Sequence, residues 1–140
     1  NSLIERRKAN RENAIRFFMM FTTVSCKHVA IENPIGVMST VNRKPDCIIQ
    51  PYQFGVSVSK ATCFWLKGLP ILNPTCIVKP KDRIKYPSGK TDDPWHAETR
   101  KLPPYERAKE RSKTFPGVAK AIAEQWGMFV LSEWQAGESK

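Results

Sequence analysis

The stretch that decides the fold is HVAIENPIG, residues 28–36. Its first half is a short apolar run typical of a buried strand, and its second half, Glu32-Asn33-Pro34-Ile35-Gly36, has the turn-forming residues that end such a run. Ligands of open α/β sheets bind beyond the carboxyl ends of such strands. We therefore expect Glu32 and Asn33 to lie in a loop that borders a binding site.

A helix is predicted over residues 4–23, immediately before this strand. Ala14, Phe17, Phe18 and Phe21 follow one another at helical spacing and share one face, while most of the arginines lie on the opposite side. We expect this aromatic stripe to pack in the core. The order helix, turn, strand and polar loop corresponds to the second half of a β-α-β unit.

Two further strands are predicted at residues 47–50 and 61–66, joined by a polar and aromatic linker, and all three strands are expected in one sheet. Residues 71–99 are rich in proline and basic residues without a helical period, which predicts a long basic loop region. A short charged helix follows at 105–112. Pro116 opens a final helix with an apolar face of Phe115, Ala119, Ile122 and Trp126, and residues 137–140 form a frayed tail. The sequence thus indicates a single α/β domain over residues 1–140.

The chain is strongly basic. Its 140 residues include 23 Lys plus Arg against 13 Asp plus Glu, a formal net charge of +10. A clustered excess of this size favours a polyanionic partner, most commonly nucleic acid, although solubility alone also explains a basic surface. No apolar run is long enough for a membrane helix, and residues 1–8 lack the apolar core of a signal peptide. We expect no membrane partner and a cytoplasmic location.

The cysteines do not suggest a metal site. No two of Cys26, Cys47, Cys63 and Cys76 have a C-x-x-C spacing. The pair of Cys26 and His28 is weak evidence for zinc. We expect buried free thiols and no bound metal.

Several segments resemble DNA cytosine-C5 methyltransferases, in the order that the family has them. Residues 30–34, AIENP, are similar to a family strand that ends in Glu-Asn-Val. Residues 55–62, GVSVSKAT, resemble the segment Gly-Val-Pro-Gln-x-Arg-x-Arg: Lys60 keeps the first positive charge, Thr62 replaces the second Arg, and Val58 stands for the Gln. Residues 100–106 and the Phe-Pro at 115–116 resemble the family's last motifs, without its Gly-Asn pair.

The likeness is closer to small bacteriophage proteins of this kind. They have segments similar to residues 31–36, 49–55, 60–70 and 111–117, so that the resemblance extends from about Ala14 to Trp126. It implies a partial Rossmann-like methyltransferase sheet with flanking helices, the C-terminal half of the fold. For a phage-encoded protein the expected location is the host cytoplasm.

Two parts of the family's catalytic apparatus are missing from the sequence. The chain has no Gly-rich loop for S-adenosylmethionine, and none of its cysteines follows a proline. The resemblance therefore implies S-adenosylmethionine only for a complete protein, and no cofactor for this chain alone. Its expected partners are DNA and the missing N-terminal half or a second protein chain.

The resemblance also assigns roles to individual residues. Glu32, with Asn33, would act on N3 of a cytosine that has left the duplex while a thiolate adds at C6. A loop carboxylate that caps a helix or pairs with an arginine is the alternative for Glu32. Lys60 and Thr62 would hold the DNA backbone, or lie on a solvated strand edge.

The basic loop completes the predicted interface. Lys79, Lys81, Arg83 and Lys85 would contact phosphates. Trp95 would stack on a base or else fix the loop to the body of the protein.

Two function classes follow from these observations. The first is the DNA-binding, base-pocket half of a phage cytosine-C5 methyltransferase-like protein that is not catalytic alone. The second is a non-catalytic phage interaction protein that binds host DNA or a host defence factor.

Overall fold

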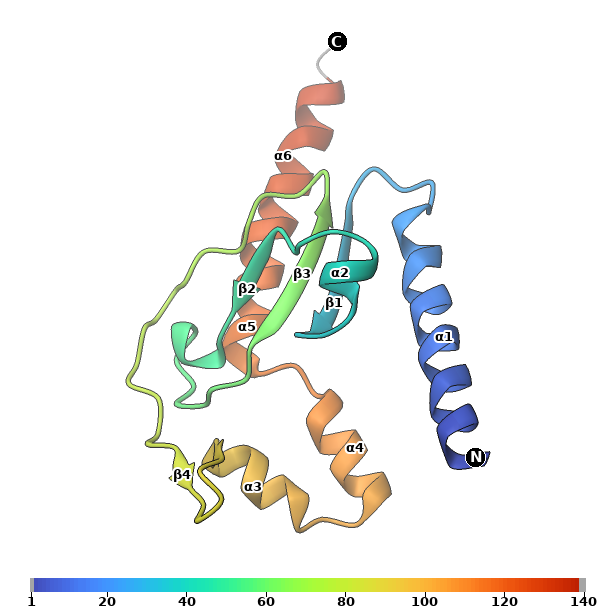
Figure 1. The fold of residues 1–140 in the computed structure, drawn as a ribbon. Coiled ribbons are helices and arrows are strands. Elements are labelled where there is room, and N and C mark those ends of the chain that lie inside the picture. Colours follow the sequence, from blue (N-terminus) through green and yellow to red (C-terminus); the bar gives the residue numbers. More distant parts are fainter. Residues whose placement is uncertain (1, 139–140) are drawn as a thin grey trace. The chain divides into compact units, whose positions relative to one another are not determined.

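The computed structural model describes residues 2–138, which form helices and two small sheets (Figure 1). This agrees with the predicted mixture of helix and strand. The chain divides into two compact units. Unit 1 contains the described residues up to Ile48 together with Thr62–Ile71, and unit 2 contains Ile49–Ala61 together with the described residues from Leu72 onward.

Helix α1, Ser2–Thr22, confirms the first predicted helix, but the predicted core face is wrong. Only Phe18 of the aromatic stripe is buried, and Ile15 and Met19 pack with it. Phe17 and Phe21 are 63% and 41% exposed, and their rings meet edge to face with centroids 5.0 Å apart. The helix therefore turns its aliphatic flank, and not the centre of the stripe, toward the sheet.

The three predicted strands share one sheet, as expected. They are β1 (Val29–Pro34), β2 (Cys47–Ile49) and β3 (Thr62–Lys67), in the order β1-β3-β2. β1 and β3 run antiparallel, with Val29 opposite Lys67 and Pro34 opposite Thr62. No parallel Rossmann-like pair is observed between β1 and β3, so the structure supports the predicted sheet but not the parallel β-α-β geometry.

Strand β1 is longer than the sequence suggested. Glu32 and Asn33 are paired with Phe64 and Cys63 of β3, so the prediction that they lie in a loop beyond the strand is wrong. These residues form a strand despite their turn-forming composition, because every residue of β1 has a pairing partner on β3. Pro34 is tolerated because it ends the strand, where its missing N–H matters least.

The core of unit 1 lies between α1, the short helix α2 (Met38–Val41) and one face of the sheet. Phe18, Met38, Cys63 and Trp65 form a buried cluster, and the Phe18 and Trp65 rings meet edge to face at 5.0 Å. The Trp65 Nε1–H donates to the Arg43 carbonyl oxygen at 2.8 Å, which satisfies its polar atom. Trp65 is therefore a core residue of unit 1.

Unit 2 is mostly helical and has a small hairpin. Its elements are the 3-10 turn η1 (Pro51–Gln53), strands β4 (Ile84–Lys85) and β5 (Thr91–Asp92), helices α3 (Pro94–Arg100), α4 (Pro104–Ser112) and α5 (Pro116–Ala121), the π-helical turn η2 (Ile122–Trp126) and helix α6 (Gly127–Glu138). Residues 105–112 and the helix start at Pro116 are as predicted. The prediction of a long basic loop over residues 71–99 is wrong in part, because this region contains the antiparallel β4–β5 hairpin and ends in α3.

The closing helix confirms the predicted apolar face only in part. Trp126 is buried as predicted, and Phe115 and Ile122 are half-buried, whereas Ala119 is exposed. Val118 and Ala121, which were not predicted, are buried. The π-helical turn η2 adds a residue to one turn, so that Trp126, five residues after Ala121, shares a face with it. Of the predicted frayed tail, Gly137 and Glu138 belong to α6, and the rest lies outside the described residues.

Gly117 marks a close approach within unit 2. A Cβ at this position would lie 1.8 Å from the Phe54 carbonyl oxygen, so only glycine allows α5 to come this near to the segment after η1.

The four thiols are all free. Only Cys63 is fully buried, while Cys26 and Cys76 are exposed, which corrects the expectation that all would be buried. Within residues 2–138, no helix combines the length and apolar character needed to cross a membrane.

Candidate functional site

Glu32 and Asn33 lie on opposite faces of the unit 1 sheet. Successive side chains of a strand point to opposite sides, and the alternating burial of β1 agrees with this. Glu32 is exposed, across from Phe64, and Asn33 is half-buried, across from Cys63. The structure therefore makes the Glu32 carboxylate accessible to a ligand but does not bring both side chains into one pocket. Thr62, opposite Pro34, is half-buried at the start of β3.

Cys63 has the wrong environment for a nucleophile. Burial raises the pKa of its thiol above the ordinary value, and the nearby Cys47 and Glu32 side chains raise it further. A thiol held in its neutral form is a poor nucleophile, because the thiolate is the reactive species. Cys63 is thus a core residue.

An ion pair fixes the segment that precedes β2. Arg43 donates two hydrogen bonds to Asp46, at 2.9 and 2.8 Å, and Asp46 also accepts from the Leu66 N–H at 2.6 Å. The hydrogen bond from Arg43 is the main reason that the pKa of the Asp46 carboxyl is lowered; partial burial opposes it and the Leu66 N–H adds to it. The same pair raises the pKa of Arg43.

Lys60 and Trp95, both in unit 2, are brought together, but by internal contacts. The Lys60 Nζ donates to the Arg111 carbonyl oxygen at 2.8 Å and lies 5.6 Å from the centre of the Trp95 ring. Trp95 is half-buried in the first turn of α3, and its ring packs edge to face on Phe115 at 5.3 Å. This packing agrees with the alternative that Trp95 fixes the segment in place.

The four loop cations are exposed, on and before the β4–β5 hairpin. Lys79 lies 4.0 Å from Asp82 in a fully solvated pair. Arg83 donates to the Thr91 side chain at 3.0 Å and to its carbonyl oxygen at 3.2 Å, which ties the two strands together. Among residues 2–138, no partner is observed for the side chains of Lys81 and Lys85.

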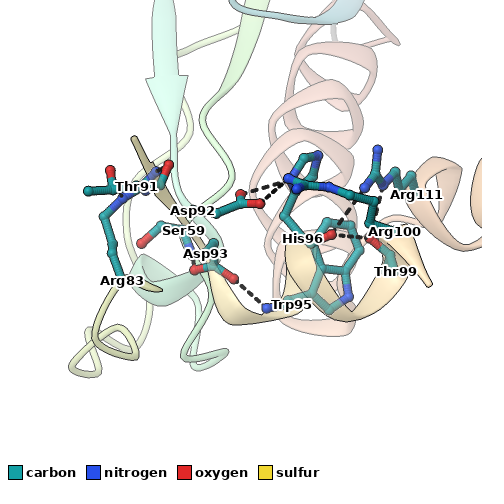
Figure 2. Close-up of polar contacts among 10 residues, drawn as sticks. All are labelled: Ser59, Arg83, Thr91, Asp92, Asp93, Trp95, His96, Thr99, Arg100 and Arg111. Carbon is teal, nitrogen blue, oxygen red and sulfur yellow. Dashed lines mark hydrogen bonds and ion pairs between the residues drawn. The ribbon is translucent and has the colours of Figure 1, made fainter. Parts of the chain in front are cut away.

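A polar network that the sequence analysis missed lies directly after this hairpin (Figure 2). Asp92, 8% exposed, accepts from His96 Nδ1 at 2.8 Å and from the Arg100 guanidinium. His96 and Arg100 themselves remain partly exposed. Figure 2 shows the His96 and Arg100 side chains on the same side of the Asp92 carboxylate, with Arg83 and Thr91 on its other side. The buried carboxylate therefore orients two cationic or proton-carrying groups at the surface.

A second layer of bonds holds this network in place. Asp93 is 1% exposed; it caps α3 by accepting from the Trp95 N–H at 2.8 Å, and it accepts from the Ser59 N–H at the same distance. Arg111 of α4 donates to the Thr99 hydroxyl at 2.9 Å and to the His96 carbonyl oxygen at 3.1 Å. These bonds join the segment around Ser59, α3 and α4 of unit 2.

Arg100 gives this network donors for an anion, because it keeps N–H groups beyond the one that bonds to Asp92. His96 donates through Nδ1–H to Asp92, and its Nε2 is a donor only when the imidazole is protonated. His96 and Arg100 lie four residues apart on one face of α3, and Asp92 lies just before the helix, so the spacing of four residues could have indicated this cluster.

Within the described residues, no three His, Cys, Asp or Glu side chains gather as a metal site. Comparisons with protein-family models, with curated proteins and with solved structures find no match for this chain.

Proposed function

We propose that this chain is the DNA-binding, base-pocket half of a phage DNA cytosine-C5 methyltransferase-like protein, and that it is not catalytic alone. The observation that carries the proposal is the position of the two best-matched segments. The Glu-Asn segment lies on β1, and GVSVSKAT leads into β3, the strand that pairs with β1. The two segments thus lie on neighbouring strands, although the pair that they form is antiparallel and not the parallel pair of a Rossmann-like sheet.

Glu32 is the residue to which the proposal gives chemistry. Its exposed position on β1 leaves the carboxyl group free to hold or share a proton at N3 of a flipped cytosine, which would make C6 more open to attack. The half-buried Asn33, on the other face, would support the strand and would not touch the base. The residues present do not fit S-adenosylmethionine, because the chain has no Gly-rich loop, and no step of methyl transfer is assigned to them.

The enzymatic part of the proposal has a direct test. The purified chain should not incorporate labelled methyl groups into DNA, and calorimetry should detect no tight binding of S-adenosylmethionine, because the nucleophile and the cofactor loop are absent. Methyl incorporation by the chain alone would contradict the proposal. Addition of the protein half that supplies both elements should restore incorporation, and Glu32→Gln should then reduce it.

The proposed DNA contacts lie on unit 2. The exposed cations on and before the hairpin, together with Arg100, would bind phosphates without reading the base sequence. Lys60 and Trp95 support this surface from within, because their side chains are already engaged with Arg111 and Phe115.

A fluorescence-polarisation titration with duplex DNA at two salt concentrations tests these contacts. Replacing Lys79, Lys81, Arg83 and Lys85 by Ala should weaken binding on all sequences alike, and it should flatten the salt slope by about 0.9 for each phosphate that is no longer neutralised. A matched control replaces Arg6, Arg7, Lys8 and Arg11 by Ala. These residues are exposed on α1, and their replacement also removes four positive charges. An equal effect of both variants would mean that net charge alone governs binding. Glu32→Gln should leave duplex binding nearly unchanged, since its partner is a base.

One observation favours the non-catalytic interaction protein as a second candidate. Phe17 and Met20, one helical turn apart on α1, are 63% and 65% exposed, an unusual position for large apolar side chains on two successive turns. If the chain binds no DNA even at low salt, this candidate takes precedence.

A further inference from the structure

A pocket in unit 1 has no part in the proposed DNA contacts. It encloses about 260 Å³ between the carboxyl end of α1, the residues after α2, and strands β1 and β3. Ile31 lines it, so it lies on the sheet face opposite to Glu32. Its size is close to the lower end of small-ligand sites in proteins.

Part of the wall of this pocket is apolar and aromatic. Ile31 and Trp65 line it from the sheet and Phe21 lines it from α1. Trp65 is buried and held by its hydrogen bond to Arg43, so it forms a rigid wall. Phe21 is 41% exposed and offers ring surface to a flat ligand.

The polar groups that line the pocket are cationic or neutral. Lys67 donates one hydrogen bond to the Val24 carbonyl oxygen at 3.0 Å, and no carboxylate within residues 2–138 is paired with it. Arg43 also lines the pocket, but Asp46 neutralises it. The Asn42 side-chain amide, half-buried, makes no hydrogen bond in the described part of the chain. The site therefore offers one uncompensated positive charge and an unused donor and acceptor.

We propose that this pocket binds a nucleotide, with the base against Phe21, its polar edge on the Asn42 amide, and its phosphate on Lys67. A nucleotide combines the three features that the pocket complements: a flat ring, edge donors and acceptors, and a negative charge. The nucleotide is either a free mononucleotide or one unit of a single strand. This site goes beyond the proposed function, since it shares no residue with Glu32 or the hairpin.

The test follows the indole N–H resonance of Trp65 by NMR, assigned by loss of the signal in Trp65→Phe. Titration with deoxycytidine 5′-monophosphate should shift this resonance saturably. A short single-stranded oligonucleotide forms the second arm: tighter binding with the same shift identifies a strand as the natural source, and weaker binding identifies the free nucleotide.

Three variants make the test specific. Lys67→Met keeps the aliphatic stem and should weaken binding about tenfold, and Asn42→Leu should weaken it about fivefold. Lys44→Met, beside Arg43 but outside the pocket lining, should change the affinity less than about twofold. The variant in which Lys79, Lys81, Arg83 and Lys85 are replaced by Ala should bind the mononucleotide as tightly as the unmodified chain. A loss of duplex DNA binding can therefore be distinguished from a loss of mononucleotide binding.

Three outcomes overturn the proposal. The first is no saturable shift with either nucleotide probe. The second is equal affinity for deoxyribose 5-phosphate, which would reveal an anion site without a base. The third is an equal loss in Lys44→Met and Lys67→Met, which would show that general charge attraction causes the binding. If the first outcome is accompanied by a shift with an acidic peptide, a protein partner replaces the nucleotide in this pocket.

Discussion

Asp93→Ala is expected to destabilise unit 2 more than the substitution of any exposed residue in that unit. The carboxylate accepts hydrogen bonds from the Trp95 and Ser59 N–H groups, both at 2.8 Å, and is 1% exposed. Loss of a helix cap costs about 1 kcal/mol. A half-buried N–H left without a partner at Ser59 adds about 1–2 kcal/mol. The free energy of unfolding should therefore fall by about 2–3 kcal/mol.

The assay is urea unfolding followed by circular dichroism, with hydrogen exchange of the α3 amides as a local measure, because a chain of two units need not unfold in one step. Asp93→Ser keeps a good capping residue, so only the hydrogen bond from the Ser59 N–H is lost. Its free energy of unfolding should therefore fall by about half as much as that of Asp93→Ala. Asp82→Ala is the control, because Asp82 is 95% exposed and its pair with Lys79 is 4.0 Å long. A loss below about 0.5 kcal/mol for Asp93→Ala, or equal losses in all three variants, would refute the reasoning.

Two further substitutions test the packing and the electrostatics. Gly117→Ala places a Cβ against the Phe54 carbonyl oxygen and should lower the melting temperature, at a cost of about 1–3 kcal/mol, whereas Gly127→Ala meets no atom within 4 Å and should be neutral or slightly stabilising. Asp46→Asn should lower the free energy of unfolding by about 1 kcal/mol at neutral pH, after allowance for solvent screening. Because the folded-state pKa of Asp46 is lowered, its contribution is present above the unfolded pKa of about 4 and is lost as the pH falls through the folded value, so wild-type and variant melting temperatures should converge in acid.

The sequence predicted those elements whose signal is local and repeated. Residues 4–23 follow a helical period over several turns, and the strands at 47–50 and 61–66 are compact apolar runs between turn-forming residues. Their pairing into one sheet follows from the need to bury these runs together. The predicted face of α1 is wrong because aromatic residues outweigh Ile15 and Met19 in any hydrophobic pattern, while the sheet accepts only the flank with Phe18.

The remaining errors arise where distant residues decide the local structure. Glu32 and Asn33 have the composition of a turn, and only the partners on β3 make them a strand. The β4 and β5 strands are too short for an alternating pattern. Helix α3, in contrast, was predictable from the sequence, because Asp93 followed by Pro94 is a strong helix start that the high proline content of the segment obscured.

The cations of unit 2 are not equally available to bind phosphates. The net charge counts all of them equally, but the structure shows that some are hydrogen-bonded within the protein and others are not. Lys60 is committed to Arg111, and Arg83 uses its hydrogen bonds on Thr91. An engaged cation still attracts phosphates, but it must break internal bonds to contact them directly. Lys81 and Lys85, exposed and without a side-chain partner in residues 2–138, have no such cost. If unit 2 binds DNA, these two lysines should therefore account for most of the salt dependence, and Lys60 should matter mainly through the stability of the surface that it supports.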